Sequence, residues 1–239
     1  MITPSAQKLT TSITERMVYG LFRAFLLLTS WLPLSVSRVI GRGLGYGYYK
    51  LARRRVQFAR INMQICFPKL PEEQKEERVK QCLMHGGMWF MEAGAIWSWP
   101  RKKILQYVTV DNPQLLSAAI EKGHGVILAV PHIGNWELMG PLITLHHDFA
   151  CFYQHDQKKT KLISEYIQKR RTTHGVVMAA ADASGVRTLY KHLKMGKVAG
   201  LLPDHNPTDD MGIFAPFYGR PALTGTLISS LSRKNSAPV

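Results

Sequence analysis

From residue 104 to the end of the chain, short apolar runs alternate with longer amphipathic segments. A short run that is apolar throughout is typical of a strand buried on both faces, and the amphipathic segments have the spacing of helices. This alternation predicts an α/β fold, with a largely parallel or mixed sheet flanked by helices. The expected strands are 107–110, 126–130, 149–153, 176–180 and 198–202, and the expected helices lie near 113–122, 135–146, 159–172, 184–195 and 221–232.

The most apolar stretch of the chain is residues 17–40. It contains 14 uncharged residues between Arg23 and Arg38, which span about 21 Å as a helix, against ~30 Å for the hydrocarbon core of a bilayer. Pro33 would also kink or end such a helix. We therefore expect an N-terminal membrane-associated helix that is tilted or embedded in one leaflet. A cleaved signal peptide and a buried amphipathic helix remain open as alternatives.

The chain is strongly basic, with 31 Lys and Arg against 16 Asp and Glu and a net charge of +15. Such a surface predicts a polyanionic partner, and charge alone does not choose between nucleic acid, anionic lipid and an acidic protein. A basic cluster without any acid directly follows the apolar stretch, which favours an anionic membrane surface on the cytoplasmic side. Its members are Arg42, Lys50, Arg53, Arg54, Arg55 and Arg60.

Two glycine patterns lie in this N-terminal half. Glycines alternate at positions 41, 43, 45 and 47, and no strand precedes them, so they indicate close packing of small residues, not a dinucleotide-binding turn. A helix is expected to begin at Pro71, because acidic residues crowd the first turn and apolar positions then recur at helical spacing. Gly86 and Gly87 lie in the middle of that helix and weaken the prediction.

Several common kinds of site are not indicated by the sequence. Cys66, Cys82 and Cys151 are far apart and include no C-x-x-C pair, so neither a disulfide framework nor a zinc knuckle is expected. The sequence also has no G-x-S-x-G elbow, no Walker loop and no H-E-x-x-H motif. We expect no metal and no cofactor.

The densest chemical signal is VILAVPHIGNWELMG, residues 126–140. His132 follows the expected strand and Pro131, Asn135 is a good helix N-cap, and Glu137 lies in the first turn of the next helix. On one helix the side chains of His132 and Glu137 would lie about 140° apart, so they meet only if His132 folds back from a loop. There a carboxylate could fix the imidazole tautomer. Equally, Glu137 could simply complement the helix dipole.

A second pair with the same spacing, His205 and Asp210, follows Pro203 and contains Pro207. It lacks the compact strand, loop and helix context of the first pair. We therefore place the candidate site at His132.

The His-x4-Glu pair set in PHIGNWE resembles the signature block of the lysophospholipid acyltransferase superfamily. The branch that it resembles is the late (secondary) acyltransferases of lipid A biosynthesis, the lauroyl and myristoyl transferases. The similarity extends from the N-terminal apolar segment to the end of the chain and includes residues 152–175, 189–207 and 212–224. Gln154 is a departure, because relatives often carry arginine there.

This resemblance implies an enzyme that moves a fatty acyl group from acyl carrier protein to a hydroxyl of a lipid A precursor. His132 would be the general base and Glu137 would orient it, with no protein nucleophile. Backbone N–H groups near Asn135 would stabilise the oxyanion. The residues matching substrate-binding positions are Asn135, Arg170, Arg171 and Asp204; one of the two arginines would hold a phosphate or the site architecture, and Asp204 would bind the acceptor or order its loop.

The resemblance also implies a location at the cytoplasmic face of the bacterial inner membrane, with an anionic membrane surface and no nucleic acid as partners. The expected organisation is an N-terminal tail at 1–16, a membrane anchor at 17–50 and an acyltransferase domain at 51–239. Because residues 237–239 have the pattern of a starting strand, that domain is expected to be incomplete at its C-terminus. The alternatives are a glycerophospholipid-type acyltransferase and a non-catalytic basic protein that binds membranes or nucleic acid.

Overall fold

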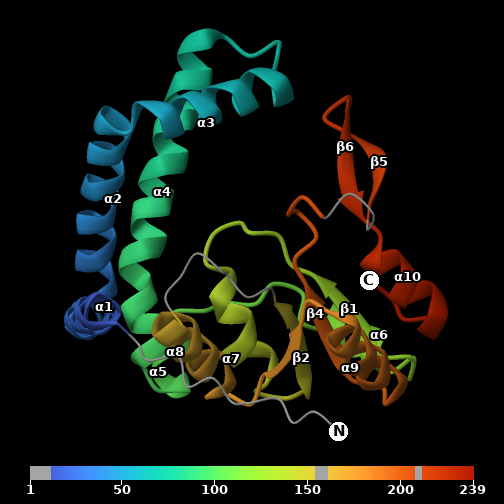
Figure 1. Cartoon of the computed structure of the whole chain (residues 1–239). Helices are drawn as coiled ribbons and strands as arrows, with labels where there is room; N and C mark the ends of the chain where they lie inside the picture. Colours follow the sequence, from blue (N-terminus) through green and yellow to red (C-terminus); the bar gives the residue numbers. More distant parts are fainter. Residues whose placement is uncertain (1–11, 154–160, 208–211) are drawn as a thin grey trace, which may run out of the picture.

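A computed structural model describes residues 12–153, 161–207 and 212–239. The chain forms a helical arm and an α/β body that lie side by side (Figure 1). The arm consists of α1 (Ile13–Trp31), α2 (Leu34–Leu51), α3 (Arg53–Cys66) and the long α4 (Glu72–Ser98). Short helices α5 (Arg101–Leu105) and α6 (Gln114–Ile120) lead from the arm into the body.

The apolar N-terminal stretch is broken into two helices. α1 ends at Trp31 and α2 begins at Leu34, so Pro33 interrupts the helix as its ring predicts. α1 and α2 both pack on α4, so the helices on either side of residue 50 belong to the same arm. In the part of the chain that the structure describes, no helix is both long and apolar enough to cross a bilayer.

Glycines bring α2 and α4 into close contact. A Cβ atom at Gly41 or Gly45 would overlap the backbone of α4, and one at Gly87 would overlap the backbone of α2. Gly43 and Gly47, on the other side of α2, have open space around them. The small-residue interpretation is therefore confirmed at alternate glycines. Gly86 and Gly87 do not interrupt α4, which runs from Glu72 to Ser98, and Gly87 stands where the backbone of α2 leaves no room for a Cβ atom.

The body is built on a four-stranded sheet, which confirms the predicted α/β class. Its strands are β1 (Val126–Ala129), β2 (Phe149–Tyr153), β3 (Val177–Ala180) and β4 (Val198–Leu201). All pair in parallel in the order β1-β4-β2-β3, with Val126 opposite Val198 in the β1–β4 register. Beside β1, the N–H of Ile127 donates to the carbonyl of Pro238, so residue 238 is hydrogen-bonded to that edge of the sheet.

Helices cover both faces of this sheet. α9 (Ala183–Lys194) and α10 (Leu227–Asn235) pack on one face around the fully buried Ile127, Leu189 and Leu193. α6 and α7 (Met139–Ile143) cover the other face around Phe149 and Val198. α8 (Lys161–Thr172) contacts β3 and also α1 and α4, so it joins the body to the arm.

Two expected elements are wrong. Residues 107–110 form no strand; they follow α5 as an irregular segment, and Val108 packs on the cluster of Trp99 and Ile104. Residues 221–232 are not one helix, because β6 (Arg220–Gly225) pairs antiparallel with β5 (Gly212–Phe217) before α10 begins. The hairpin turns at Tyr218 and Gly219, which both have positive φ, as a two-residue hairpin turn requires.

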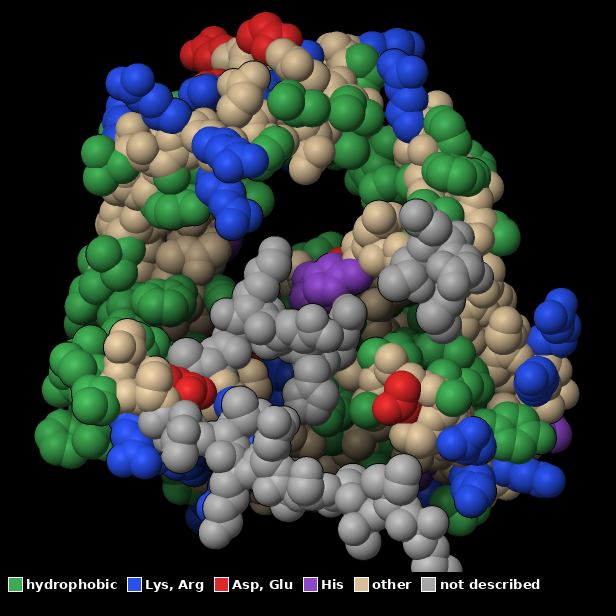
Figure 2. All heavy atoms as spheres, viewed as in Figure 1, with side chains coloured by type: hydrophobic (Ala, Val, Ile, Leu, Met, Phe, Trp, Pro, Cys, Tyr) green, Lys and Arg blue, Asp and Glu red, His purple; other side chains and the backbone are tan. Residues whose placement is uncertain are grey.

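The β5–β6 hairpin reaches toward the far end of the arm. The ring of Tyr218 at its tip meets the ring of Phe67 at the end of α3, with centroids 5.2 Å apart. Figure 2 shows an opening between arm and hairpin, with histidine side chains at its lower edge.

Candidate active site

His132 and Asp204 occupy matching places on neighbouring strands. Each follows the end of its strand by three residues, β1 ending at Ala129 and β4 at Leu201. Because β1 and β4 are parallel neighbours, their carboxyl ends lie together and bring the two residues into contact. The N–H of Val130 donates to the carbonyl of Leu201 and continues the pairing toward the site.

Asp204 holds His132 by both backbone and side chain. The N–H of His132 donates to Oδ2 of Asp204 at 2.7 Å, and Nδ1 of the imidazole lies 2.8 Å from Oδ1. Partial burial acts to raise the pKa of Asp204, but the hydrogen bonds from His132 outweigh burial and lower that pKa below its ordinary value. Asp204 is therefore a carboxylate at neutral pH, with both oxygens directed at His132.

Two aromatic contacts fix the plane of the His132 ring. The imidazole of His205 stacks on it, with centroids 3.8 Å apart and an interplanar angle of 11°. The indole of Trp136 meets it edge-on at 5.2 Å. With Nδ1 directed at Asp204, the ring keeps Nε2 for another partner. In residues 12–153, 161–207 and 212–239, no serine, threonine or cysteine is hydrogen-bonded to His132.

Glu137 is turned into the interior. It lies in the 3₁₀ turn η1 (Trp136–Leu138) and is 8% exposed. Arg171 of α8 makes a bidentate pair with its carboxylate: Nη2 donates to Oε1 at 2.5 Å and Nε to Oε2 at 3.1 Å. Trp97 of α4 donates from Nε1 to Oε2 at 3.3 Å. Burial acts to lower the pKa of Arg171, but the bonds to Glu137 outweigh it and raise that pKa.

The structure thus separates the two residues that the sequence pairs. The hydrogen bonds of Glu137 go to Arg171 and Trp97, whereas the carboxylate on His132 is that of Asp204. The physical reason is local. Residues 133–135 run as a loop with Gly134 at a φ of 59°, and the following turn is a tight 3₁₀ helix that directs Glu137 away from the loop.

Asn135 connects the loop to the arm instead of capping a helix. Its Nδ2 donates to Oε2 of Glu92 at 2.7 Å, and Arg38 donates from Nε to Oε1 of the same glutamate at 2.6 Å. Glu92 is buried in α4. The Oδ1 atom of Asn135 is buried and has no partner among the described residues.

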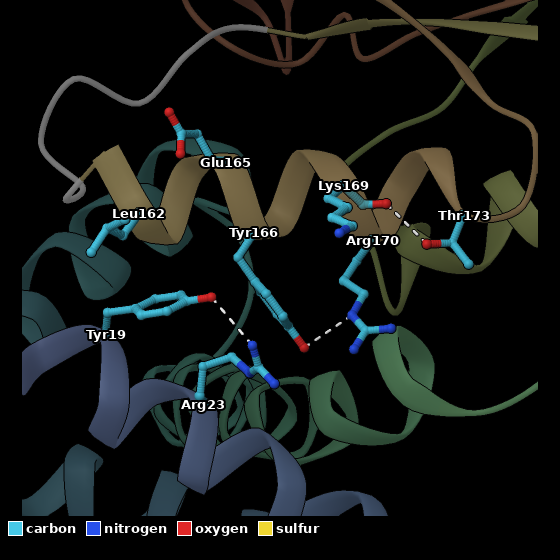
Figure 3. Close-up of a pocket in the computed structure, with 8 residues that line it drawn as sticks. All are labelled: Tyr19, Arg23, Leu162, Glu165, Tyr166, Lys169, Arg170 and Thr173. Carbon is cyan, nitrogen blue, oxygen red and sulfur yellow. Dashed lines mark hydrogen bonds between the residues drawn. The ribbon is translucent and has the colours of Figure 1, made fainter. Parts of the chain in front are cut away.

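The two neighbouring arginines of α8 point to different places. Arg171 faces Glu137, and its guanidinium lies 5.1 Å from the ring centroid of Trp136. Arg170 instead donates from Nε to the hydroxyl of Tyr166 at 3.0 Å, in a pocket between α8 and α1 (Figure 3). Only Arg171 therefore contacts the loop that carries His132.

Three residues of this site, Glu92, Trp97 and His205, are not predicted from the sequence as site residues. Trp97 and Glu92 come from α4, where Glu92 is a lone acid in the apolar run MWFMEAGAIW. A single acid in an apolar helix was a usable signal, because a buried carboxylate needs partners. His205 was noticed only for its spacing to Asp210, which lies outside the described residues, as does Gln154.

An imidazole whose Nδ1 contacts a carboxylate, at the carboxyl edge of a parallel sheet, has the geometry that general-base catalysis by histidine uses. The part of the chain that the structure describes contains no group of three or more His, Cys, Asp or Glu that could hold a metal ion. The fold thus brings a histidine and a carboxylate together where the parallel strands end.

Comparison with known proteins places the chain in a family. The family model for bacterial lipid A biosynthesis acyltransferases matches residues 6–239, so the chain belongs to that family. It is 27% identical over 213 residues to a lipid A biosynthesis acyltransferase of Haemophilus influenzae, which covers 86% of this chain and 66% of that protein.

Two relatives from Escherichia coli are also similar to the chain. The lipid A biosynthesis palmitoleoyltransferase is 25% identical over 187 residues, or 78% of this chain and 60% of that protein. The lipid A biosynthesis lauroyltransferase is 24% identical over 210 residues, which are 86% of this chain and 66% of that protein. The chain thus spans between 60% and 66% of the length of these three relatives.

Proposed function

We propose that this chain transfers a fatty acyl group from the thioester of acyl carrier protein to a hydroxyl group of a lipid A precursor. Family membership supports the reaction class and the acceptor. The observation that carries the mechanism is the His132–Asp204 pair at the carboxyl edge of the sheet, 2.8 Å between Nδ1 and Oδ1.

In this mechanism His132 is the general base. Its Nδ1–H is donated to Asp204, which leaves the lone pair of Nε2 to accept the proton of the acceptor hydroxyl. The oxygen attacks the thioester carbonyl and forms a tetrahedral intermediate. That intermediate collapses to the ester and expels the carrier thiolate, which takes the proton back from the imidazolium. The carboxylate of Asp204 stabilises the imidazolium between these two proton transfers.

Glu137 acts on His132 indirectly, through Arg171 and Trp136. Its pair with Arg171 is buried and bidentate, and Arg171 lies over the ring of Trp136. Trp136 in turn contacts the edge of the His132 ring. We therefore assign Glu137 and Arg171 as positioning residues that hold Trp136 and, through it, the imidazole.

The loop also offers donors for the oxyanion. We assign this role to backbone N–H groups around Asn135, since the N–H groups of Gly134, Asn135 and Trp136 make no hydrogen bond within the described chain. Asn135 itself is held by Glu92, which keeps the loop in place while charge develops on the substrate oxygen.

We further propose that the arm lies on the cytoplasmic face of the bacterial inner membrane. One side of α1 presents large apolar residues that are between 63% and 79% exposed, and a helix with such a face binds in the headgroup region. These residues are Ile13, Met17, Leu21, Leu28 and Trp31. Figure 2 shows hydrophobic side chains gathered along the outer side of the arm. The net charge of +15 suits anionic lipid, acidic carrier protein and phosphorylated glycolipid.

The test is transfer of labelled acyl chain from acyl carrier protein to a lipid A precursor in mixed micelles. His132→Ala should lower the rate about 10²- to 10⁴-fold, because it removes the base. Asp204→Asn should also lower it strongly, because the imidazolium loses its counter-charge. His146→Ala, which truncates an exposed histidine outside the site, is the matched control.

Circular dichroism would confirm that each variant is folded. A rate in His132→Ala equal to that of the control would refute the general-base role. A lysophospholipid offered in parallel tests the acceptor class: faster acylation of that lipid than of the lipid A precursor would refute the proposed acceptor.

A further inference from the structure

We propose that the pocket between α1 and α8 binds a phosphate monoester carried on a lipid. The identity of that lipid as the acceptor glycolipid rests on the proposed function, whereas the phosphate chemistry rests on the pocket itself. The pocket lies on the side of α8 that faces the arm, and neither Arg171 of α8 nor its partner Glu137 of η1 lines it.

The pocket has a volume of about 280 Å³, and its lining is predominantly cationic. Figure 3 shows Arg23, Lys169 and Arg170 around it, with Tyr166 between the two guanidinium groups. The one carboxylate of the lining, Glu165, points away from the arginines and lies 3.8 Å from Lys161. The full lining is Tyr19, Arg23, Leu162, Glu165, Tyr166, Lys169, Arg170 and Thr173.

The two arginines are held in place without neutralisation of their charge. Arg23 donates from Nη1 to the hydroxyl of Tyr19 at 3.3 Å, and Arg170 donates from Nε to the hydroxyl of Tyr166 at 3.0 Å. Their guanidinium carbons lie 4.9 and 5.1 Å from the ring centroid of Tyr166. In the described residues neither arginine pairs with a carboxylate. Two cations that share one ring repel each other, and an anion bound between them removes that repulsion.

A phosphate monoester fits this arrangement better than a diester. An arginine has five N–H donors, and each of these two spends one on a tyrosine, so most of their donors remain for a ligand. The fork of a guanidinium matches two phosphate oxygens at once. A monoester presents three terminal oxygens and close to two negative charges, whereas a diester presents two such oxygens and one charge. Lys169 adds the third positive charge.

The position of Arg23 on α1 indicates that the phosphate belongs to a lipid. At about 100° per residue, Arg23 lies between two stripes of the helix. One is the buried stripe of Tyr19, Phe22 and Leu26, which packs against α4 and α8. The other is the exposed apolar stripe, centred about 120° from Arg23. A helix lying in the headgroup region with that stripe in the hydrocarbon would hold Arg23 at the depth of lipid phosphates.

The decisive measurement is sedimentation of the protein with phosphatidylcholine vesicles of two kinds. One contains phosphatidic acid, a lipid phosphomonoester, and the other contains enough phosphatidylglycerol, a diester, to match the charge. The wild type should prefer the first. Arg23→Gln/Arg170→Gln should weaken binding to the phosphatidic acid vesicles by on the order of tenfold to a hundredfold and abolish the preference. Arg187→Gln/Lys191→Gln removes the same charge from exposed positions of α9 and should retain the preference.

A preference retained in Arg23→Gln/Arg170→Gln, or absent in the wild type, would overturn the proposal. Lys169→Gln, at an exposed position of α8, is a milder variant and should lose part of the preference with the fold intact. Inorganic phosphate tests the source: if phosphate alone binds the wild type as tightly as the vesicles do, the ligand is free phosphate and the lipid assignment is wrong.

Acyl transfer measured on the same samples separates this inference from the proposed function. Transfer by a wild type without any vesicle preference would refute the pocket alone. A vesicle preference in a wild type that transfers no acyl group would refute the function and leave the phosphate site standing.

Discussion

The buried Glu137–Arg171 pair gives the sharpest test of how the site is held. Glu137→Gln keeps the shape of the side chain but removes the charge that partners Arg171. The side chains are 5% and 24% exposed, so the guanidinium would be left largely buried and unpaired. Breaking a buried pair in this way costs about 3–5 kcal/mol, and the residual exposure of Arg171 places our expectation near 3 kcal/mol. Urea unfolding followed by circular dichroism measures that loss.

Two further variants decide whether the loss has this cause. Glu137→Gln/Arg171→Met removes both charges and should recover part of the stability, since no uncompensated charge remains. Glu77→Gln breaks the exposed pair with Lys80 and should leave the stability nearly unchanged, because water screens that pair. A loss below about 1 kcal/mol in Glu137→Gln, or a double variant less stable than either single one, would refute the account. Acyl transfer should fall alike in Glu137→Gln and Arg171→Met, because both free Trp136.

Two predictions concern the arm. Gly87→Ala should cost about 1–3 kcal/mol of stability or prevent folding of the arm, because its Cβ overlaps the backbone of α2. Gly86→Ala has open space around it and should be neutral or gain up to about 1 kcal/mol of stability. Equal stability of the two variants, measured by urea unfolding, would contradict the packing. Arg60 lowers the pKa of Glu76 from 4.5 to about 2, so the stability from this pair is complete above pH 4.5 and is lost as pH falls from 4.5 to about 2. Unfolding measured across that range should show a smaller loss in Glu76→Gln than in the wild type, and an identical loss would contradict the pairing.

The strands of the sheet could be predicted because a strand buried on both faces is a short run that is apolar throughout. Residues 149–153 match β2 residue for residue, and the other three sheet strands differ by one residue at an end. The same pattern gave a wrong prediction at 107–110, which form no strand but an irregular segment that packs on Trp99 and Ile104 through Val108. Apolar composition indicates burial, but it does not say whether a neighbouring strand is available.

The hairpin was missed for a different reason. Residues 221–232 contain enough apolar positions at mixed spacing to suit a helix, yet 220–225 pair with 212–217. The usable signal was Tyr218-Gly219 between two short runs, since a glycine at the second position suits a two-residue hairpin turn. Tyrosine at a positive φ is uncommon, which made the turn harder to identify from sequence.

The partner of His132 depended on topology. Glu137 is near in sequence, whereas Asp204 is 72 residues away and reaches the imidazole because β4 lies next to β1. Sequence could indicate that both residues follow strands, and the resemblance marked Asp204 as a site residue. It could not give the strand order, which alone decides which carboxylate faces the histidine.

The loop that carries His132 is attached to the arm at two points. Glu92 binds Asn135 and Trp97 binds Glu137, and both partners come from the C-terminal part of α4. Glu92 also binds Arg38 of α2, so one buried carboxylate joins the two packed helices to the loop. The glycine contacts also pack α4 closely against α2, so the loop is joined through α4 to the rest of the arm. Because α1 packs on α4 as well, the apolar face that we propose for the membrane and the imidazole that we propose for catalysis are connected through α4.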